Sequence, residues 1–406
     1  MSSQAQIPRP LREALHRRLL DLPFDPAHLA PDELRARLEI LLHDEAPLVT
    51  DAAAASVVDA VVADVEGLGP LQALLAEPAI SEVMVNGPGR VFVERNGCLE
   101  AVPCDLDAET IVRIAQRVVA PLGLRLDRAA PMVDARLPDG SRLHAVLPPL
   151  APDGPCITIR RFAVEALTLA DFGLSATHAE FLRALVRAGW NIVVSGATSA
   201  GKTTCANALA RAIDPSERVV TIEETVELRL GLPHVVRLEA RPANAEGVGA
   251  VGVRELVRAA LRMRPDRLVV GEVRGGEAFD MLQALNTGHD GSLSTVHANS
   301  PTDALARLET LVLLGGVALP LAAVRGQLAA AIDAVVQVAR RATGAREIVD
   351  VGEVGPARGS RAVGVRSLLV RDRDALVPAA PPARPARRAG YELEEAWWAC
   401  TPSAAR

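Results

Sequence analysis

The spacing of apolar and polar positions divides the chain into regions of different structure. Residues 1–66 are predicted to form an amino-terminal helical segment, because Pro31-Asp32-Glu33 places a proline and two acids at a helix start and Asp51 can cap the next helix. In residues 67–165, short segments with the pattern of β-strands are separated by turn signals such as Asn86-Gly87-Pro88-Gly89. This second pattern predicts a compact, smaller α+β domain.

From about residue 176 the pattern changes to strands that alternate with helices. That alternation is typical of an α/β domain with a mostly parallel sheet, which we place at residues 176–354. Residues 166–175 are then expected to be a linker. The last region, 355–406, is rich in proline, alanine and arginine and lacks the apolar periodicity of a core, so it is predicted to be a disordered tail.

A glycine-rich loop joins a short strand to a helix within the predicted α/β domain. The strand, residues 191–195, is rich in β-branched side chains, and the loop after it reads G-x-x-x-x-G-K-T. Between a strand and a helix, this is the pattern of a phosphate-binding loop, whose backbone N–H groups face an anion. We expect ATP to be held by Gly196, Ala197, Thr198, Ser199, Ala200, Gly201, Lys202, Thr203 and Thr204.

Lys202 also differs from the rest of the chain in composition. It is the single lysine among 44 basic residues, all the others being arginines. Arginine does not replace a compact ammonium on a flexible stem. We expect Lys202 to reach the β- and γ-phosphates and the Thr203 hydroxyl to ligate Mg²⁺.

Three further predicted strands end in groups that are useful for phosphoryl transfer: Glu223, Glu272 and His297. Because ligands bind beyond the carboxyl ends of parallel strands, we expect these groups to line the same edge of the sheet as the loop. A carboxylate there can orient the attacking water or hold Mg²⁺ through water, and a histidine can sense the γ-phosphate.

Charge and cysteine content narrow the class of protein. The net charge of −6 argues against a dedicated nucleic-acid binder, so no direct contact with nucleic acid is expected. The five cysteines are scattered and form no C-x-x-C pair, which fits a reducing compartment. With neither a signal-peptide pattern nor a transmembrane segment in the sequence, we expect a cytoplasmic protein that reaches a membrane only through partners.

Several long motifs resemble one family closely. Residues 261–309 (LRMRPDRLVVGEVRGGEAFDMLQALNTGHDGSLSTVHANSPTDALARLE) are similar to the core signature of the type II/type IV secretion ATPase superfamily. Together with residues 67–97, residues 131–162 and the phosphate loop, they resemble the CpaF-like branch, which assembles tight-adherence (Flp-type) pili. The resemblance covers roughly residues 60–350.

This resemblance implies a homo-hexameric ring of two-domain subunits, each with a RecA-like ATPase domain, that hydrolyses ATP to power pilus assembly. An inner-membrane platform protein is the implied partner. The family's catalytic glutamate falls on Glu223, its Walker B acid on Glu272, which would hold Mg²⁺ through water, and its His-box histidine on His297.

The resemblance also implies that arginines of the amino-terminal domain reach the nucleotide. Arg142, Arg160 and Arg161 stand at matching places, and Arg136 matches less closely. Arginine suits such a role because its planar guanidinium binds phosphate oxygens in pairs.

Two features depart from the family pattern. Glu223-Glu224 stands where Glu-Asp is usual, and the extra methylene is expected to slow turnover if it shifts the metal geometry. Trp397-Trp398, in the tail, suits either a docking peptide for a membrane protein or a short helix that packs on its own core.

Three other functions remain open. A type IV secretion or DNA-transfer ATPase shares the same core motifs. An ATP-binding ring scaffold with little hydrolysis is suggested by Glu224. A single-strand DNA translocase is disfavoured by the net charge and by an aromatic content of only 2%, since such proteins stack bases on aromatic rings.

Overall fold

The structure, a computed structural model, describes residues 9–20, 31–65, 67–161, 167–244, 246–341, 343–357, 361–373 and 375–394. The chain divides into two compact units, Met1–Ala163 and Val164–Arg406, and each is described by itself. In the part of the chain covered by these ranges, no helix is long and apolar enough to cross a membrane.

The first unit begins with three helices, α1 (Arg9–Leu20), α2 (Pro31–Glu45) and α3 (Asp51–Val65). Leucines of α1 and α2 pack with valines of α3 in a small core: Leu15, Leu19, Leu34, Leu38, Leu42, Val57, Val58 and Val61. Burial of these apolar side chains stabilises short helices that would be marginal in isolation.

An antiparallel sheet forms the rest of the first unit, with the strand order β3-β2-β1-β6-β5-β4. Alternate strand residues face a core that they share with α5, whose first turn is capped by the Asp107 carboxylate. The elements are α4 (Leu71–Ala76), β1 (Ile80–Asn86), β2 (Val91–Arg95), β3 (Cys98–Val102), α5 (Ala108–Val119), η2 (Ala120–Leu122), β4 (Met132–Arg136), β5 (Arg142–Val146) and β6 (Cys156–Arg160).

The second unit is built on a nine-stranded sheet with the order β15-β14-β13-β12-β7-β11-β10-β8-β9. The six strands from β12 to β9 in that order are parallel, which confirms the predicted α/β class. The elements up to β10 are η3 (Leu169–Phe172), α6 (Ala176–Arg187), β7 (Ile192–Gly196), α7 (Lys202–Ala210), β8 (Val219–Glu223), β9 (Val235–Glu239), α8 (Val253–Ala260) and β10 (Arg267–Val270). The remaining ones are α9 (Glu277–Asn286), β11 (Leu293–His297), α10 (Pro301–Leu314), α11 (Leu321–Ala331), β12 (Ala334–Arg340), β13 (Arg346–Val354), β14 (Val365–Asp372) and β15 (Ala375–Pro378).

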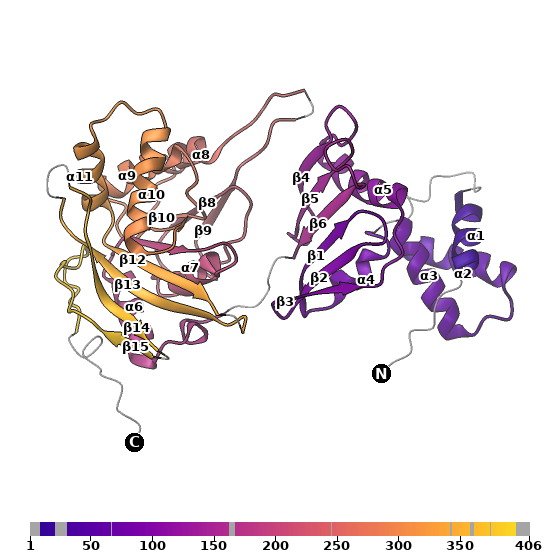
Figure 1. Ribbon diagram of the computed structural model, residues 1–406, viewed down its shortest axis with the longest axis horizontal. Helices are drawn as coiled ribbons and strands as arrows, with labels where there is room; N and C mark the ends of the chain where they lie inside the picture. The colour runs from indigo at the N-terminus through magenta and orange to yellow at the C-terminus, as the bar shows by residue number, and fades with distance from the viewer. Residues whose placement is uncertain are drawn as a thin grey trace, which may run out of the picture. The chain divides into compact units, whose positions relative to one another are not determined.

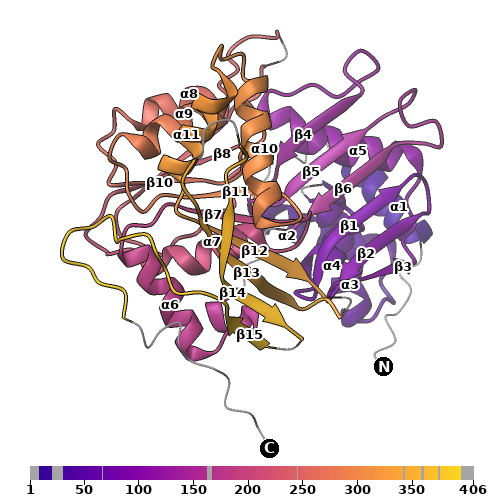
Figure 2. The same ribbon diagram turned by 60° about the vertical axis from the view of Figure 1, so that its left-hand side comes forward.

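Helices cover both faces of this sheet (Figure 1). One core contains side chains of α6 and α7, and the other contains side chains of α8, α9, α10 and α11. Neighbouring residues of β7 point to opposite cores, with Ile192 and Val194 in the first and Val193 in the second. Figure 2 shows the same layers after a turn of 60°. Burial on both faces explains why these strands read as continuous apolar runs.

The prediction of a linker at residues 166–175 is wrong for the described residues. Leu169 and Phe172 of η3 are fully buried in the core beside α6 and α7. Thr168 and Asp171 form a capping box, in which the Thr168 N–H donates to an Asp171 oxygen at 2.7 Å. These apolar side chains make the segment part of the second unit.

The prediction of a disordered tail from residue 355 is also wrong where the structure describes it. The strands β14 and β15 extend the sheet by antiparallel pairing, and their leucines are buried. Residues 379–394 then run back across the unit, and Tyr391 and Leu393 pack against the core beside α6. Trp397 and Trp398 lie outside the described residues.

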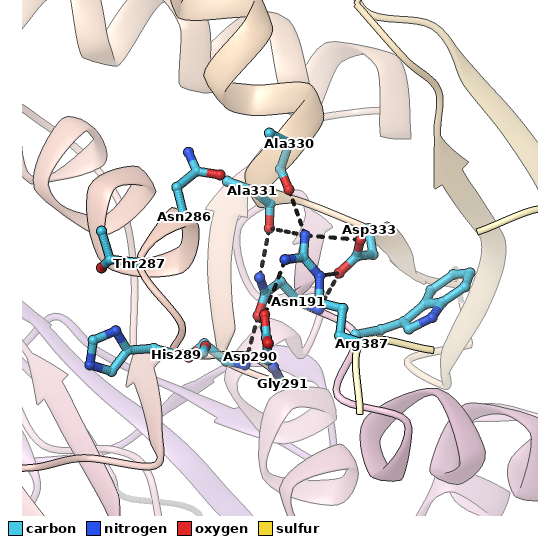
Figure 3. Close-up of polar contacts among 12 residues, drawn as sticks. Asn191, Asn286, Thr287, His289, Asp290, Gly291, Ala330, Ala331, Asp333 and Arg387 are labelled. Carbon is cyan, nitrogen blue, oxygen red and sulfur yellow. Dashed lines mark hydrogen bonds and ion pairs between the residues drawn. The ribbon is translucent and has the colours of Figure 1, made fainter. Parts of the chain in front are cut away.

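The returning segment is held by ion pairs at the amino-terminal ends of the parallel strands. Arg387 donates to Asp333 at 2.5 Å and to Asp290 at 3.1 Å (Figure 3). Arg384 also donates to Asp333, at 2.6 Å, and Asn191 donates its backbone N–H to the same carboxylate. The arginine-rich composition that suggested disorder therefore serves to bind buried carboxylates.

Candidate nucleotide site

The glycine-rich loop leaves the fully buried strand β7 at Gly196 and enters α7 at Lys202. Gly201 has a φ of 95°, a left-handed conformation that favours glycine. A Cβ atom on Gly196 would lie 2.7 Å from the carbonyl oxygen of Val338 on β12. Both glycines of the motif are therefore required by the local geometry, the first by close packing and the second by the turn.

The Lys202 side chain folds back over this loop. Its Nζ donates to the carbonyl oxygen of Ala197 at 3.0 Å and lies 3.1 Å from Nδ1 of His297. Lys202 is only 8% exposed, at the first position of α7, while Thr203 and Thr204 behind it are partly buried. The predicted lysine and histidine thus meet, although 95 residues separate them.

His297 links Lys202 to the acid that follows β10. Its Nε2 lies 2.5 Å from Oε1 of Glu272. Burial is the main cause that lowers the pKa of His297; Glu272 acts to raise that pKa and the Lys202 ammonium to lower it further. The ring thus lies between the Lys202 ammonium and the Glu272 carboxylate, whose Oε1 has no hydrogen-bond partner among the described residues.

Glu272 continues this chain of contacts through Arg274. The Arg274 Nε donates to Glu272 at 2.8 Å, and its Nη1 donates to Glu224 at 2.8 Å. Glu224 therefore pairs with an arginine at the surface, where 61% of its side chain is exposed. We call Lys202, His297, Glu272, Arg274 and Glu224 the polar chain of the site.

Glu223 ends β8 and is 3% exposed. Its Oε1 accepts the backbone N–H groups of Glu227 and Leu228, at 2.9 and 3.0 Å. Gly271 makes room for it, because a Cβ on Gly271 would lie 2.7 Å from Cγ of Glu223. The carboxylate is thus fixed by the turn after β8 and by the glycine at the end of β10.

The strands that carry these groups are neighbours in the order β7-β11-β10-β8. The structure therefore brings together the phosphate loop, Glu223, Glu272 and His297 at one edge, as the parallel topology predicts. Oxygen donors such as the Thr203 hydroxyl and the Glu272 carboxylate are ligands that suit Mg²⁺.

Two residues that the sequence did not single out belong to this edge. One is Arg274 of the polar chain. The other is Gln337, which accepts from the Ser195 hydroxyl at the end of β7 and donates to the carbonyl oxygen of Ala298, beside His297. A signal existed for Gln337, because it is the one polar residue inside the apolar run 334–339.

Three of the four predicted arginines form a row in the first unit. Arg136, Arg142 and Arg160 are direct cross-strand partners on β4, β5 and β6, and Glu82 of β1 faces Arg160 at the end of the row. Direct partners on neighbouring strands point to the same face. Like charges that are direct cross-strand partners repel each other.

Arg161 differs from that row. Its Nη1 donates to the backbone carbonyl oxygens of Glu77 and Ile80, at 2.6 and 2.9 Å. As the residue after Arg160, it leaves the strand and ties the start of β1 to the end of β6. The structure does not group Arg161 with the other three arginines.

Comparison with known proteins identifies the family. Residues 64–368 match the family described as "Type II/IV secretion system protein". The chain belongs to this family. It is accordingly an ATPase, and the glycine-rich loop is where a member of this family would hold its nucleotide.

Several relatives are similar over most of their length. Rv3659c of Mycobacterium tuberculosis, whose name assigns it provisionally to conjugal transfer, is 44% identical over 73% of this chain and 87% of its own length. The type IV secretion system protein PtlH of Bordetella pertussis is 38% identical over 69% of this chain and 93% of its own. Among solved structures, the pilus retraction motor PilT with bound ADP matches with a TM-score of 0.52 at 20% identity, over 69% of this chain and 80% of PilT; that likeness concerns the fold alone.

Proposed function

We propose that this ATPase is a motor that works as a homo-hexameric ring and couples ATP hydrolysis to a secretion machine in the inner membrane. The observation that carries the proposal is the polar chain beside Glu223. From Lys202 through His297 to Glu272, it joins the phosphate loop to the carboxyl ends of β11 and β10, so a change at the nucleotide is transmitted to these two strands, and Glu224 is its exposed end. The ring, a cytoplasmic location and the platform protein are expected from the family resemblance.

The residues of the edge have distinct roles in this proposal. Lys202, the loop backbone and Thr204 hold the phosphates, and Mg²⁺, held by Thr203 and through water by Glu272, would neutralise phosphate charge. Glu223 orients the attacking water or accepts its proton, since two backbone N–H groups fix its carboxylate. His297 moves from Lys202 toward the γ-phosphate when ATP is present, and Arg142 and Arg160, with Arg136, contribute positive charge from the first unit.

Two processes are candidates for what the motor drives. The quoted motifs favour assembly of tight-adherence pili. The names of Rv3659c and PtlH favour conjugal transfer or type IV secretion instead. Deletion of the gene in the host tests the two alternatives. Loss of pili with normal DNA transfer would support pilus assembly, and loss of DNA transfer with normal pili would support conjugal transfer.

The test of the motor is Glu223→Gln, which removes the base and keeps the side-chain volume. We expect phosphate release to fall about a thousandfold, the scale of losing a group that acts in the transition state, while ATP still binds. Phosphate release and calorimetric ATP binding measure the two effects, with Glu224→Gln as the matched control. Near-normal turnover in Glu223→Gln would show that Glu223 is not the catalytic base. If the unsubstituted protein assembles rings with ATP but does not hydrolyse it, the ATP-binding scaffold would be favoured over the motor.

A further inference from the structure

An arginine from the far side of β7 reaches the phosphate loop. Arg346 opens β13, at the end of the hairpin that this strand forms with β12. Its Nη1 lies 3.3 Å from Oγ1 of Thr204, the third residue of α7. A Cβ on Gly201 would lie 2.7 Å from Cδ of Arg346, so the arginine stem crosses the end of the loop. The contact joins residues 142 positions apart.

The sheet order determines the direction from which this arginine comes. β11, β10 and β8, which carry His297, Glu272 and Glu223, lie on one side of β7, whereas β12 and β13 lie on the other. The hydrolytic groups and Arg346 therefore approach the loop from opposite sides. If the γ-phosphate faces the acids, the phosphates that stay on the nucleoside extend toward β13.

The first turn of α7 is suited to an anion on that side as well. The first N–H groups of a helix have no acceptor in a preceding turn, and the helix dipole adds positive potential there. A guanidinium held against this turn adds a full charge and paired donors for phosphate oxygens. The glycine at 201 is what allows the arginine stem so close to the loop.

We propose that Arg346 is a nucleotide-binding residue that contacts the phosphates that ATP and ADP share, the α- and β-phosphates, on the side of the loop away from the γ-phosphate. The inference rests on the proposed function in one respect, namely that the loop holds an adenine nucleotide. A contact to a non-reacting phosphate is made equally before and during hydrolysis. Such uniform binding sets KM and the affinity for product, and leaves kcat unchanged.

The experiment titrates ADP and ATP into the full-length protein by calorimetry and measures steady-state hydrolysis. For Arg346→Gln we expect the Kd of both nucleotides to rise about tenfold or more, by the same factor, which is the scale of a charge-assisted hydrogen bond. The value of kcat should stay within about twofold, and Arg346→Lys should recover part of the affinity. Arg341→Ala is the matched control, because Arg341 lies on the same hairpin and pairs with Glu347 at the surface.

Three results would overturn the inference. An unchanged Kd with a lower melting temperature would make Arg346 a clip between β13 and α7. An unchanged Kd with a lower kcat would make it part of the hydrolytic machinery. Weaker binding of ATP alone would place it at the γ-phosphate. If the unsubstituted protein binds neither nucleotide, the proposed function itself fails, and that result is distinct from the other three.

Discussion

The amino-terminal and carboxyl-terminal ends of the parallel strands form two edges of the sheet. Both edges carry charged side chains, but these differ in burial and in their partners. At the amino-terminal edge, Arg267 is fully buried and donates to Glu217 through two nitrogens, at 2.7 and 3.0 Å. Burial acts to raise the pKa of Glu217, but hydrogen bonds from Arg267 and Arg388 outweigh it and hold that pKa below its ordinary value. At this edge, arginines pair with carboxylates that are almost fully buried, Glu217 and Asp333.

The carboxyl-terminal edge is more open. Lys202 donates to a backbone carbonyl and lies against a neutral imidazole, and both are acceptors that a phosphate can replace. The side chains of His297 and Arg274 are 38% and 53% exposed, whereas that of Asp333 at the opposite edge is 4% exposed. At the amino-terminal edge, arginines paired with buried carboxylates therefore hold the fold. At the carboxyl-terminal edge, Lys202 lies on acceptors that a phosphate can replace, and its neighbours His297 and Arg274 are partly exposed.

The largest effect is expected for Lys202→Ala, which tests whether the carboxyl-terminal edge serves catalysis and not folding. We expect ATP hydrolysis to fall about a thousandfold or more, because the charge on the transferring phosphates is lost. The melting temperature of the nucleotide-free protein should change little, since this edge does not hold the fold. Phosphate release and thermal unfolding measure the two properties. A large drop in melting temperature would show that the two edges are not distinct in this way.

Asp333→Ala tests the amino-terminal edge, where we expect a loss of stability. It leaves Arg384 and Arg387 without their buried carboxylate, so we expect the free energy of unfolding to fall by about 3 kcal/mol. Urea denaturation followed by circular dichroism measures the loss. Asp290→Ala removes a more exposed partner of the same Arg387 and should cost less than about 1 kcal/mol. Equal costs for both would contradict the view that burial decides the strength of this edge.

The smallest effect is expected for Glu224→Gln. Glu224 pairs with Arg274 at the surface, and exposed pairs contribute less than about 1 kcal/mol. Turnover should therefore stay within about threefold of the unsubstituted protein, which phosphate release at saturating ATP measures. A tenfold change in either direction would mean that the unusual Glu223-Glu224 pair does affect metal geometry.

Much of the site could be predicted from the sequence, because its parts are local. The loop from Gly196 to Thr203 is defined by consecutive residues between a strand and a helix. Glu223, Glu272 and His297 each end or follow an apolar run, and parallel topology brings such ends to one edge. Their pairing in space, with His297 between Lys202 and Glu272, follows from the strand order β7-β11-β10-β8.

The tail and the arginines show where prediction from sequence failed. Residues 379–394 have the composition of a disordered segment, yet Arg384 and Arg387 bind a carboxylate about 50 residues away. No spacing rule separates such arginines from solvated ones in a chain with so many. The family resemblance groups Arg161 with Arg142, although Arg161 binds backbone carbonyls.

By itself, the sequence determined the glycine-rich loop between a strand and a helix, the α/β class, and the positions of Glu223, Glu272 and His297 at strand ends, because short-range spacing and periodicity specify strands, turns and helix starts. Only the tertiary structure decided which of the many arginines are buried partners of Glu217 and Asp333, and that Arg346 lies against Thr204. The physical reason is that a guanidinium can pair with any carboxylate or phosphate in reach. What comes within reach is set by contacts between residues far apart in the chain, after the sheet has formed.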